Sequence, residues 1–359
     1  MTDLSIPVGV AIVLTVIVLW KLFYNHRDLV MKYAERRKGK EDVSLLIKRN
    51  DETIISINPH AVLPLASTVK IIIAIAFARQ VSDNTIDEHA SIPKEELLKF
   101  YIKDTDGGAH KQWVQANADK EQYTLKEIAI GMIAYSSNAN TEFLMNYLGL
   151  DAINLLPTSL HLTSHTPMFP IVSALYIPSF IEAKEKVTDK KDLIKRLQRM
   201  SRKEYIHFSK EIHEHLAANE QKGYMEEGKL DVEFQKIWSD RLPAASAQDY
   251  LTLMQMINRR EAFDEEMQRC LEEVLGYALY IHKGNRKWID HGGMKGGSTL
   301  FVFTHASYTT DKEGNQTEVV FLANNLTASK SRKLQRSYNS FLLNVLTNHG
   351  YRKKIGLEK

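Results

Sequence analysis

Residues 64–78, PLASTVKIIIAIAFA, form the most informative apolar segment of the chain. The run is too short and too interrupted to cross a bilayer, so it predicts a helix buried in a protein core. Ser67 and Lys70 lie three positions apart, which places them on one face of that helix, one turn from each other. Burial would desolvate the lysine amine and lower its pKa, so that it could accept the serine proton.

The spacing alone is weak evidence, because Ser91 and Lys94 repeat it in the sequence SIPK. Here, however, Glu95 and Glu96 follow the lysine and would keep it charged and solvated. Pro93 is typical of a helix start, so we interpret this second match as structural. Ser67 is therefore the candidate nucleophile.

Two polar segments add to this pair. Residues 135–138, YSSN, lie between two predicted helices, where a loop can direct a hydroxyl and an amide into a cleft. Residues 292–298, GGMKGGS, precede a predicted strand at 299–305. Glycines at that place let a ligand lie close to the strand backbone.

The order of predicted elements indicates an α+β fold. Residues 43–49 and 53–58 form a predicted hairpin near the start, and residues 299–305 and 318–323 alternate as strands near the end. Helical patterns fill most of the chain between them, and a last helix is expected over residues 331–346. We therefore expect an antiparallel sheet built from both chain ends, flanked by helices, with an all-α subdomain.

The motifs STVK, SSN and KGG, in this order, resemble the S-x-x-K, S-D-N and K-T-G set of the penicillin-recognising serine hydrolases. The class A β-lactamase type is the most similar. The resemblance extends to TLKEIAIGMIAYSSNAN and SAQDYLTLMQMIN, and it covers residues 43–149 and 243–346. It implies a bacterial β-lactamase/transpeptidase-like hydrolase that needs no cofactor or metal.

The resemblance also implies a role for each matching residue. Ser67 would be acylated, Lys70 would accept its proton, and Ser136 would relay a proton to the leaving group. The remaining matches would bind substrate: Asn138 its amide, Lys295 its carboxylate, and Gly297 and Ser298 beside them in the third motif. The backbone N–H groups of Ser67 and Ser298 would form the oxyanion hole, and each donor is typically worth about 3 kcal/mol.

Three departures from the family pattern bear on turnover. Ser137 stands where the family has Asp, and Gly296 stands where it has Thr or Ser. The chain contains no Glu-x-x-Leu-Asn, and residues 151–181 include no Glu to activate the deacylating water. We therefore expect acylation by a β-lactam, peptide or ester carbonyl with weak or absent β-lactamase turnover. The alternatives are a penicillin-recognising sensor or scaffold without turnover and a true class A-type β-lactamase.

The N-terminus predicts a membrane anchor. Residues 4–20 carry no charge, and about 20 apolar residues match the hydrocarbon core of a bilayer. We expect an anchor at residues 1–24, a basic stalk at 25–42, and a hydrolase domain at 43–350 with a charged helical insertion at 150–242. The lysines and arginines after residue 20 favour a cytoplasmic domain, whereas the resemblance implies the outside of the cell, which we favour.

Composition excludes several other classes. A formal charge of +3 gives no electrostatic argument for nucleic-acid binding, and the single cysteine, Cys270, excludes an internal disulfide. We expect His207, His213 and His215 to be surface residues rather than metal ligands, since His213 and His215 face different sides of a helix. The expected partners are a β-lactam, peptidoglycan-peptide or ester substrate and, through the N-terminal segment, membrane lipid.

Overall fold

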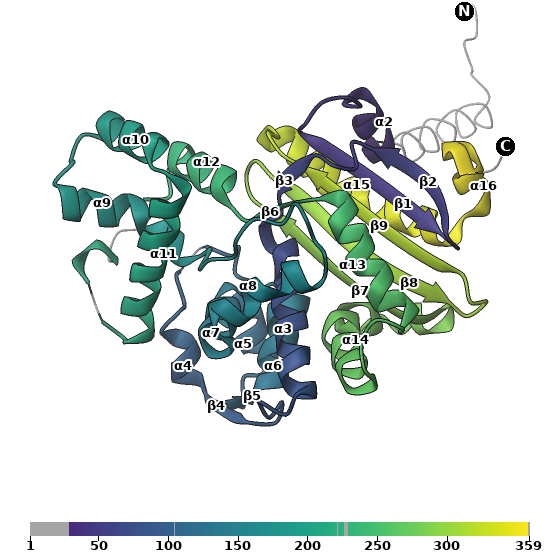
Figure 1. The fold of residues 1–359 in the computed structure, drawn as a ribbon, viewed down its shortest axis with the longest axis horizontal. Helices are drawn as coiled ribbons and strands as arrows, with labels where there is room; N and C mark the ends of the chain where they lie inside the picture. The colour runs from purple at the N-terminus through teal and green to yellow at the C-terminus, as the bar shows by residue number, and fades with distance from the viewer. Residues whose placement is uncertain (1–28, 104, 221, 226–228, 358–359) are drawn as a thin grey trace, which may run out of the picture.

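A computed structural model describes residues 29–103, 105–220, 222–225 and 229–357. Its centre is a five-stranded antiparallel sheet in the order β2-β1-β9-β8-β7. The strands are β1 (Val43–Arg49), β2 (Glu52–Ile57), β7 (Ile289–Ser298), β8 (Phe303–Asp311) and β9 (Gln316–Ala323). The predicted sheet from both chain ends is confirmed, because β1 from the start pairs with β9 from the end (Figure 1).

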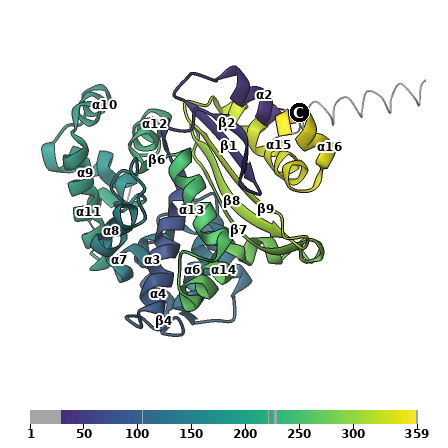
Figure 2. The same cartoon turned by 45° about the vertical axis from the view of Figure 1, so that its right-hand side comes forward.

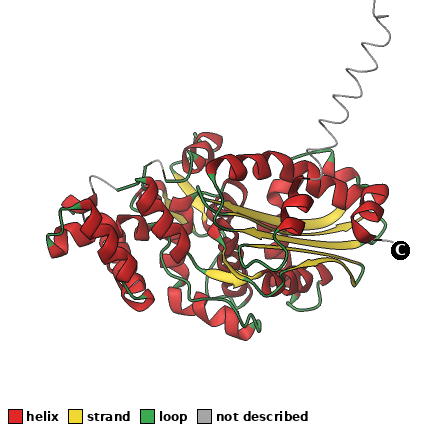
Figure 3. Ribbon diagram, turned by 90° about the horizontal axis from the view of Figure 1, so that it is seen from above, coloured by secondary structure: helices red, strands yellow, loops and turns green. Residues whose placement is uncertain are grey.

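Helices cover both faces of this sheet, as Figure 3 shows from above. On one face, α2 (Leu29–Arg36), α15 (Ala328–Thr347), α16 (His349–Arg352) and η6 (Lys353–Leu357) enclose a core that includes Val30, Phe321 and Phe341. Residues 29–36 belong to the predicted stalk, and here they form a helix whose inner side chains are buried in that core.

The second face of the sheet packs against α13 (Ala247–Arg259) and α14 (Glu265–Tyr280). Beyond them lies the helical part, centred on α3 (Lys70–Ser82), in which every residue from Lys70 to Ala78 is buried. Its other elements, with short two-stranded sheets and turns, are β3 (Val62–Pro64), η1 (Ala66–Val69), β4 (Ser91–Pro93), α4 (Lys94–Leu98), α5 (Ala109–Ala116), β5 (Gln122–Thr124), α6 (Leu125–Ile130), η2 (Gly131–Tyr135), α7 (Asn138–Leu148), α8 (Leu150–Ser159) and β6 (Ala244–Ser246). The short turn η5 (Asn285–Lys287) connects α14 to β7.

A group of helices extends from the far side of this part, and Figures 1 and 2 show it distant from the sheet's α15 face. It consists of η3 (Ser173–Tyr176), α9 (Ile177–Glu185), α10 (Lys190–Arg199), α11 (Arg202–Ala217), η4 (Gly223–Met225) and α12 (Val232–Arg241). The helical pattern expected over 183–242 is thus confirmed. The predicted insertion starts at residue 150, but α8 packs on α3 and α7 and so belongs to the helical part. From here on, "the insertion" means residues 160–242.

One predicted strand is misplaced. The sequence suggested a strand at 299–305 after the glycine-rich motif, but residues 289–298 themselves form β7, and β8 begins only at Phe303. Glycine has a low strand propensity, so the pattern favoured a loop. Close packing explains the difference: a Cβ at Gly293 would lie 2.7 Å from Leu275 Cβ on α14. The glycines therefore let a helix lie directly on this edge strand.

The described residues include no helix long and apolar enough to cross a membrane. The predicted anchor at 1–24 lies outside them, and the division into anchor, stalk and domain stays a prediction.

Candidate active site

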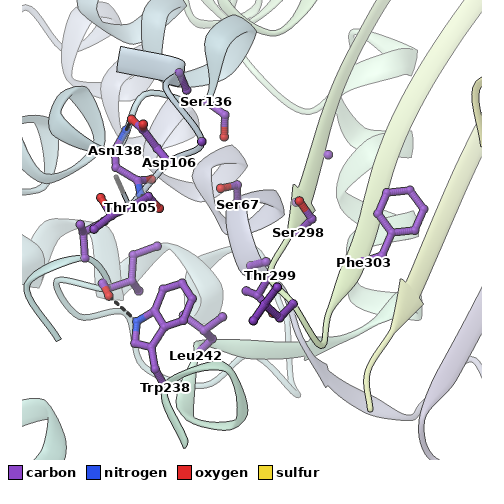
Figure 4. A pocket seen from close by; sticks show the side chains of 18 of the residues that line it. Ser67, Thr105, Asp106, Ser136, Asn138, Trp238, Leu242, Ser298, Thr299 and Phe303 are labelled. Atoms are coloured by element: carbon purple, nitrogen blue, oxygen red, sulfur yellow. Dashed lines mark hydrogen bonds between the residues drawn. The ribbon is translucent and has the colours of Figure 1, made fainter. Parts of the chain in front are cut away.

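A cavity of about 570 Å³ opens between the sheet edge, the helical part and the insertion. Ser67, Ser136, Asn138, Gly297 and Ser298 all line it, and Figure 4 shows Ser67 near its centre. The other described lining residues are Ala66, Thr105, Asp106, Gly107, Ala109, Tyr135, Ile171, Val172, Gln235, Trp238, Leu242, Gly296, Thr299, Leu300 and Phe303. Residues from three distant segments of the sequence thus share one crevice. The second match to the serine–lysine spacing falls elsewhere, with Ser91 in β4 and Lys94 in α4.

Ser67 lies in η1, the 3₁₀ turn that leads into α3. The preceding residue, Ala66, has φ 45°, a left-handed conformation that non-glycine residues adopt only when the surroundings enforce it. The enforcing contacts come from the sheet: the hydroxyls of Thr68 and Thr304 lie 2.8 Å apart, and Thr304 Oγ1 donates to Leu65 O at 2.7 Å. The turn that carries the nucleophile is therefore tied to strand β8.

Lys70 begins α3 and is completely buried. Its Nζ donates to Ser136 O at 2.8 Å and to Asn138 Oδ1 at 3.1 Å, and it lies 3.3 Å from Ser136 Oγ. Burial is the largest influence on the lysine and, with the charge of Lys295, holds its pKa well below the ordinary value; Asp106 and Glu142 oppose this. A neutral amine keeps a lone pair, so Lys70 can accept a hydroxyl proton.

The SSN motif spans the junction between η2 and α7. Ser136 has φ 68°, which turns the chain so that its side chain faces the cavity, while Ser137 caps α7. Ser137 is fully buried; its Oγ accepts from Asn140 N, donates to Asn140 Oδ1 and lies 2.9 Å from His110 Nδ1. At this position the serine hydroxyl therefore performs a helix-capping role.

Sequence reasoning missed the loop that holds Asn138. The Asn138 amide donates to Thr105 O at 3.2 Å, and its backbone N–H points to Asp106 Oδ2 at 3.4 Å. Asp106 also accepts from the backbone N–H groups of Gly108 and His110. The sequence feature that could have indicated this loop is the Asp106-Gly-Gly turn, which does not by itself indicate a cleft.

Lys295 lies on β7 and is 5% exposed. Its Nζ donates to Gly296 O at 2.8 Å, and burial lowers its pKa to about 7. On β8, His305 pairs with Gly296; burial and the Lys295 charge lower the imidazole pKa to about 3. A neutral histidine beside Lys295 adds no positive charge. Lys295 is not among the described residues that line the cavity, and its contact with a substrate carboxylate stays a prediction.

Gly297, the second glycine after the motif lysine, determines how close the sheet lies to the nucleophile. A Cβ at Gly297 would lie 2.5 Å from Ser67 N and 2.8 Å from Thr68 N. Strand β7 therefore lies directly against the start of η1, and Ser298 follows on the cavity side. This arrangement suits two backbone donors at Ser67 and Ser298, although their part in an oxyanion hole stays a prediction.

The insertion forms the opposite wall of the cavity. Ile171, Val172, Trp238 and Leu242 are apolar, and Gln235 is uncharged. Among the described lining residues, Asp106 is the single carboxylate, and it lies across the cavity on the Asn138 side. This wall agrees with the expectation that residues 151–181 bring no glutamate to the site.

Glu142 joins this wall to α7. It is fully buried and accepts hydrogen bonds from Val172 N at 2.7 Å and Ser173 Oγ at 2.6 Å; His213 Nδ1 lies 2.9 Å away. The expectation that His213 is a surface residue is wrong, because it is 5% exposed. Sequence spacing placed it correctly on a different side from His215, but its buried partner comes from a helix 71 residues away.

No group of three or more potential metal-ligating side chains occurs among the described residues. Cys270 is buried in α14, and burial raises its thiol pKa to about 12, which disfavours a reactive thiolate.

Comparisons with known proteins agree with this geometry. A family model described as "Beta-lactamase enzyme family" matches residues 27–222. The chain belongs to this family and is a β-lactamase-like serine hydrolase. No protein in the curated sequence set matches it.

Solved structures show the same fold at low sequence identity. A β-lactamase from Sphaerobacter thermophilus is 17% identical, with a TM-score of 0.53, over 89% of this chain and 97% of that one. A β-lactamase from Chitinophaga pinensis is 15% identical, with a TM-score of 0.52, over 88% and 98%. A point mutant of PBP-A, solved as an acyl-enzyme complex with penicillin G, is 15% identical, with a TM-score of 0.51, over 89% and 95%.

Proposed function

We propose that this protein is a serine hydrolase that is acylated at Ser67 by a β-lactam, peptide or ester carbonyl and releases β-lactam products slowly. The observation that carries the proposal is the shared cavity: Ser67, Ser136 and Asn138 line it, and the buried Lys70 amine bonds the latter two. The PBP-A acyl-enzyme shows that a protein of this fold reacts covalently with penicillin G.

The acylation step follows from these positions. Ser67 Oγ attacks the carbonyl carbon and transfers its proton to the neutral Lys70 Nζ, while the carbonyl oxygen becomes an oxyanion facing the N–H groups of Ser67 and Ser298. When the C–N or C–O bond breaks, the leaving atom takes a proton from Ser136 Oγ, which regains one from Lys70 Nζ at 3.3 Å. The products are an ester on Ser67 and a protonated leaving group.

Slow deacylation is supported by the insertion wall. Hydrolysis of the ester needs a base that takes a proton from water, and a positioned base contributes on the order of 10²–10⁴ in rate. Ile171, Val172, Trp238 and Leu242 offer no such group, and Asp106 is engaged by three backbone N–H groups. A β-lactam turnover faster than about 1 per second would contradict the proposal.

Intact-protein mass spectrometry after incubation with benzylpenicillin tests acylation directly. We expect one adduct of the mass of the drug, on the peptide that contains Ser67. Ser67→Ala should remove the adduct, and Ser91→Ala, which alters the second serine–lysine match, should retain it. An adduct that survives in Ser67→Ala contradicts the assignment of the nucleophile.

We also propose a single-pass membrane location, with residues 1–24 as the anchor in contact with lipid and the hydrolase domain outside the cytoplasm. The uncharged run at residues 4–20 supports the anchor, and the family likeness supports the exterior, whereas the basic residues after it favour the opposite side. Protease treatment of intact cells should remove the domain. Protection of the domain, with digestion only after lysis, would place it inside.

A further inference from the structure

The apolar wall supplied by the insertion points to a substrate class. We infer that the residues around Trp238 form a subsite for a large apolar group on the acyl part of the substrate. This inference rests on the proposed acylation of Ser67 and adds to it the chemical nature of the acyl group. We call Ile171, Val172, Trp238 and Leu242 the acyl wall.

The position of the acyl wall relative to Ser136 supports this assignment. In Figure 4, Ser136 and Asn138 lie on one side of Ser67, and Trp238 and Leu242 lie on the other. Because Ser136 delivers the proton to the leaving atom, the leaving group must lie on the Ser136 side. The part of the substrate that stays on Ser67 then extends toward the acyl wall.

The chemistry of the wall selects for an apolar group. Trp238 is partly exposed and presents an aromatic surface to the cavity. Behind it, Ile171, Val172 and Leu242 line the cavity with aliphatic side chains that are at most 3% exposed. The neighbouring Gln235 is uncharged. The cavity volume of about 570 Å³ is within the range of small-molecule sites. An apolar acyl substituent would lose water on contact with this surface, whereas a small or charged one would gain nothing from it.

The acyl wall is rigidly supported before any substrate arrives. Trp238 Nε1 donates to Ile171 O at 2.7 Å, which fixes the indole plane against the chain segment beside it (Figure 4). The following residue, Ser239, is fully buried and donates to Thr299 Oγ1 at 2.9 Å, in the turn after β7. Helix α12 is thus tied to the strand that carries Lys295, so the two sides of the cleft hold a defined separation.

Contacts behind α12 hold it from the other side. The Arg241 guanidinium donates to Leu197 O at 2.8 Å and to Met200 O at 2.8 Å, and it lies 5.0 Å from the centre of the Tyr205 ring. These partners come from α10, its C-terminal end and α11. A preorganised apolar surface binds a matching group without an ordering cost. The helices of the insertion therefore act as the scaffold of a specificity subsite.

Two penicillins that share a nucleus and differ in the side chain test this inference. We would measure the second-order acylation rate constant by intact mass for benzylpenicillin, which has a phenylacetyl group, and for the analogue with an acetyl group. The expected ratio in the wild-type chain is about 30-fold in favour of benzylpenicillin, from burial of the phenyl ring. Trp238→Ala should reduce the ratio to about threefold, and Trp238→Phe should restore most of it.

Trp288→Ala is the matched control, because Trp288 packs on the opposite core beside α15. It should keep the wild-type ratio. A ratio near one in the wild-type chain, with both penicillins forming adducts, overturns the inference and leaves the proposed function intact. A ratio that Trp238→Ala does not change overturns the assignment to this wall. Failure of both penicillins to acylate the wild-type chain overturns the proposed function itself, and the inference with it.

Discussion

The two sides of the cleft differ sharply in chemistry. The side built from η1, α3, α7 and β7 carries Ser67, the hydroxyl of Ser136 and the two buried amines of Lys70 and Lys295, with hydrogen bonds that link Lys70 to Ser136 and Asn138. The acyl wall on the insertion side is apolar and carries no titratable group. Under the proposed function, the first side forms the acyl-enzyme, and the acyl wall offers no base to hydrolyse it.

Under the proposed function, the two half-reactions of this hydrolase depend on separate structural units. Acylation, as proposed, needs groups fixed by the sheet and the central helices. Deacylation needs a group that activates water. The insertion contributes aliphatic and aromatic side chains to its wall of the cavity, and these cannot activate water. The following predictions test each side separately.

The largest effect is expected at Lys70. Lys70→Ala removes the proton acceptor and should lower the acylation rate constant by about 10³-fold or more, because an unassisted serine hydroxyl is a weak nucleophile. Stopped-flow or intact-mass kinetics with benzylpenicillin measure this change. Lys94→Ala, at the second serine–lysine match, is the control and should acylate at the wild-type rate. Acylation within tenfold of wild type in Lys70→Ala would show that another group takes the proton.

A pair of neighbouring glycines tests the contact between β7 and η1. Gly297→Ala places a methyl group 2.5 Å from Ser67 N, a clash that backbone movement alone can relieve. It should slow acylation by about 10²-fold, the scale of a lost oxyanion donor. Gly296→Ala is the matched control, since its Cβ would meet nothing closer than Thr304 O at 3.7 Å. Equal rates in the two variants would contradict the close approach.

The charge state of Lys295 predicts a pH dependence. Its pKa of about 7 means that the amine is charged below neutrality and loses its proton as the pH rises. Acylation by a substrate with a carboxylate should fall by about tenfold between pH 6 and pH 9, the scale of a hydrogen bond to a charged group. An uncharged ester should lack this fall, and Lys295→Arg should flatten it. A fall of equal size for both substrates would assign the titration to another group.

The smallest expected effect is a gain on the insertion side. Gln235→Glu introduces a carboxylate beside the acyl wall and should raise the deacylation rate constant by about fivefold, a small part of what a well-positioned base provides. Release of a fluorescent penicillin label over time measures it, and Gln235→Leu should show no gain. An equal gain in both variants would indicate loosening of the wall rather than base catalysis.

Much of the fold was accessible from local patterns. Residues 124–127, TLKE, predict a capping box at a helix start, and Thr124 and Glu127 form it at the start of α6, because such a pair depends on one helical turn alone. Strands β1 and β9, from the two chain ends, pair as expected, and Ser67, Ser136 and Asn138 share the cavity that their motifs indicated.

What sequence reasoning missed depends on contacts between distant segments. The hydrogen bond between Asn138 and Thr105 spans 33 residues, and that between Trp238 and Ile171 spans 67. The periodicity of residues along a short stretch of sequence does not indicate such distant pairs. The strand at the KGG motif was missed for a related reason, because its glycines are explained by the packing of α14 rather than by strand propensity.

A burst experiment measures both sides of the cleft at once. Mixing enzyme with excess of a chromogenic β-lactam should give a rapid burst of one equivalent of opened ring per active site, followed by a steady rate well below about 1 per second. Linear product formation from the first turnover, at or above that rate and abolished by Ser67→Ala, would show efficient deacylation and contradict the division of function between the two walls.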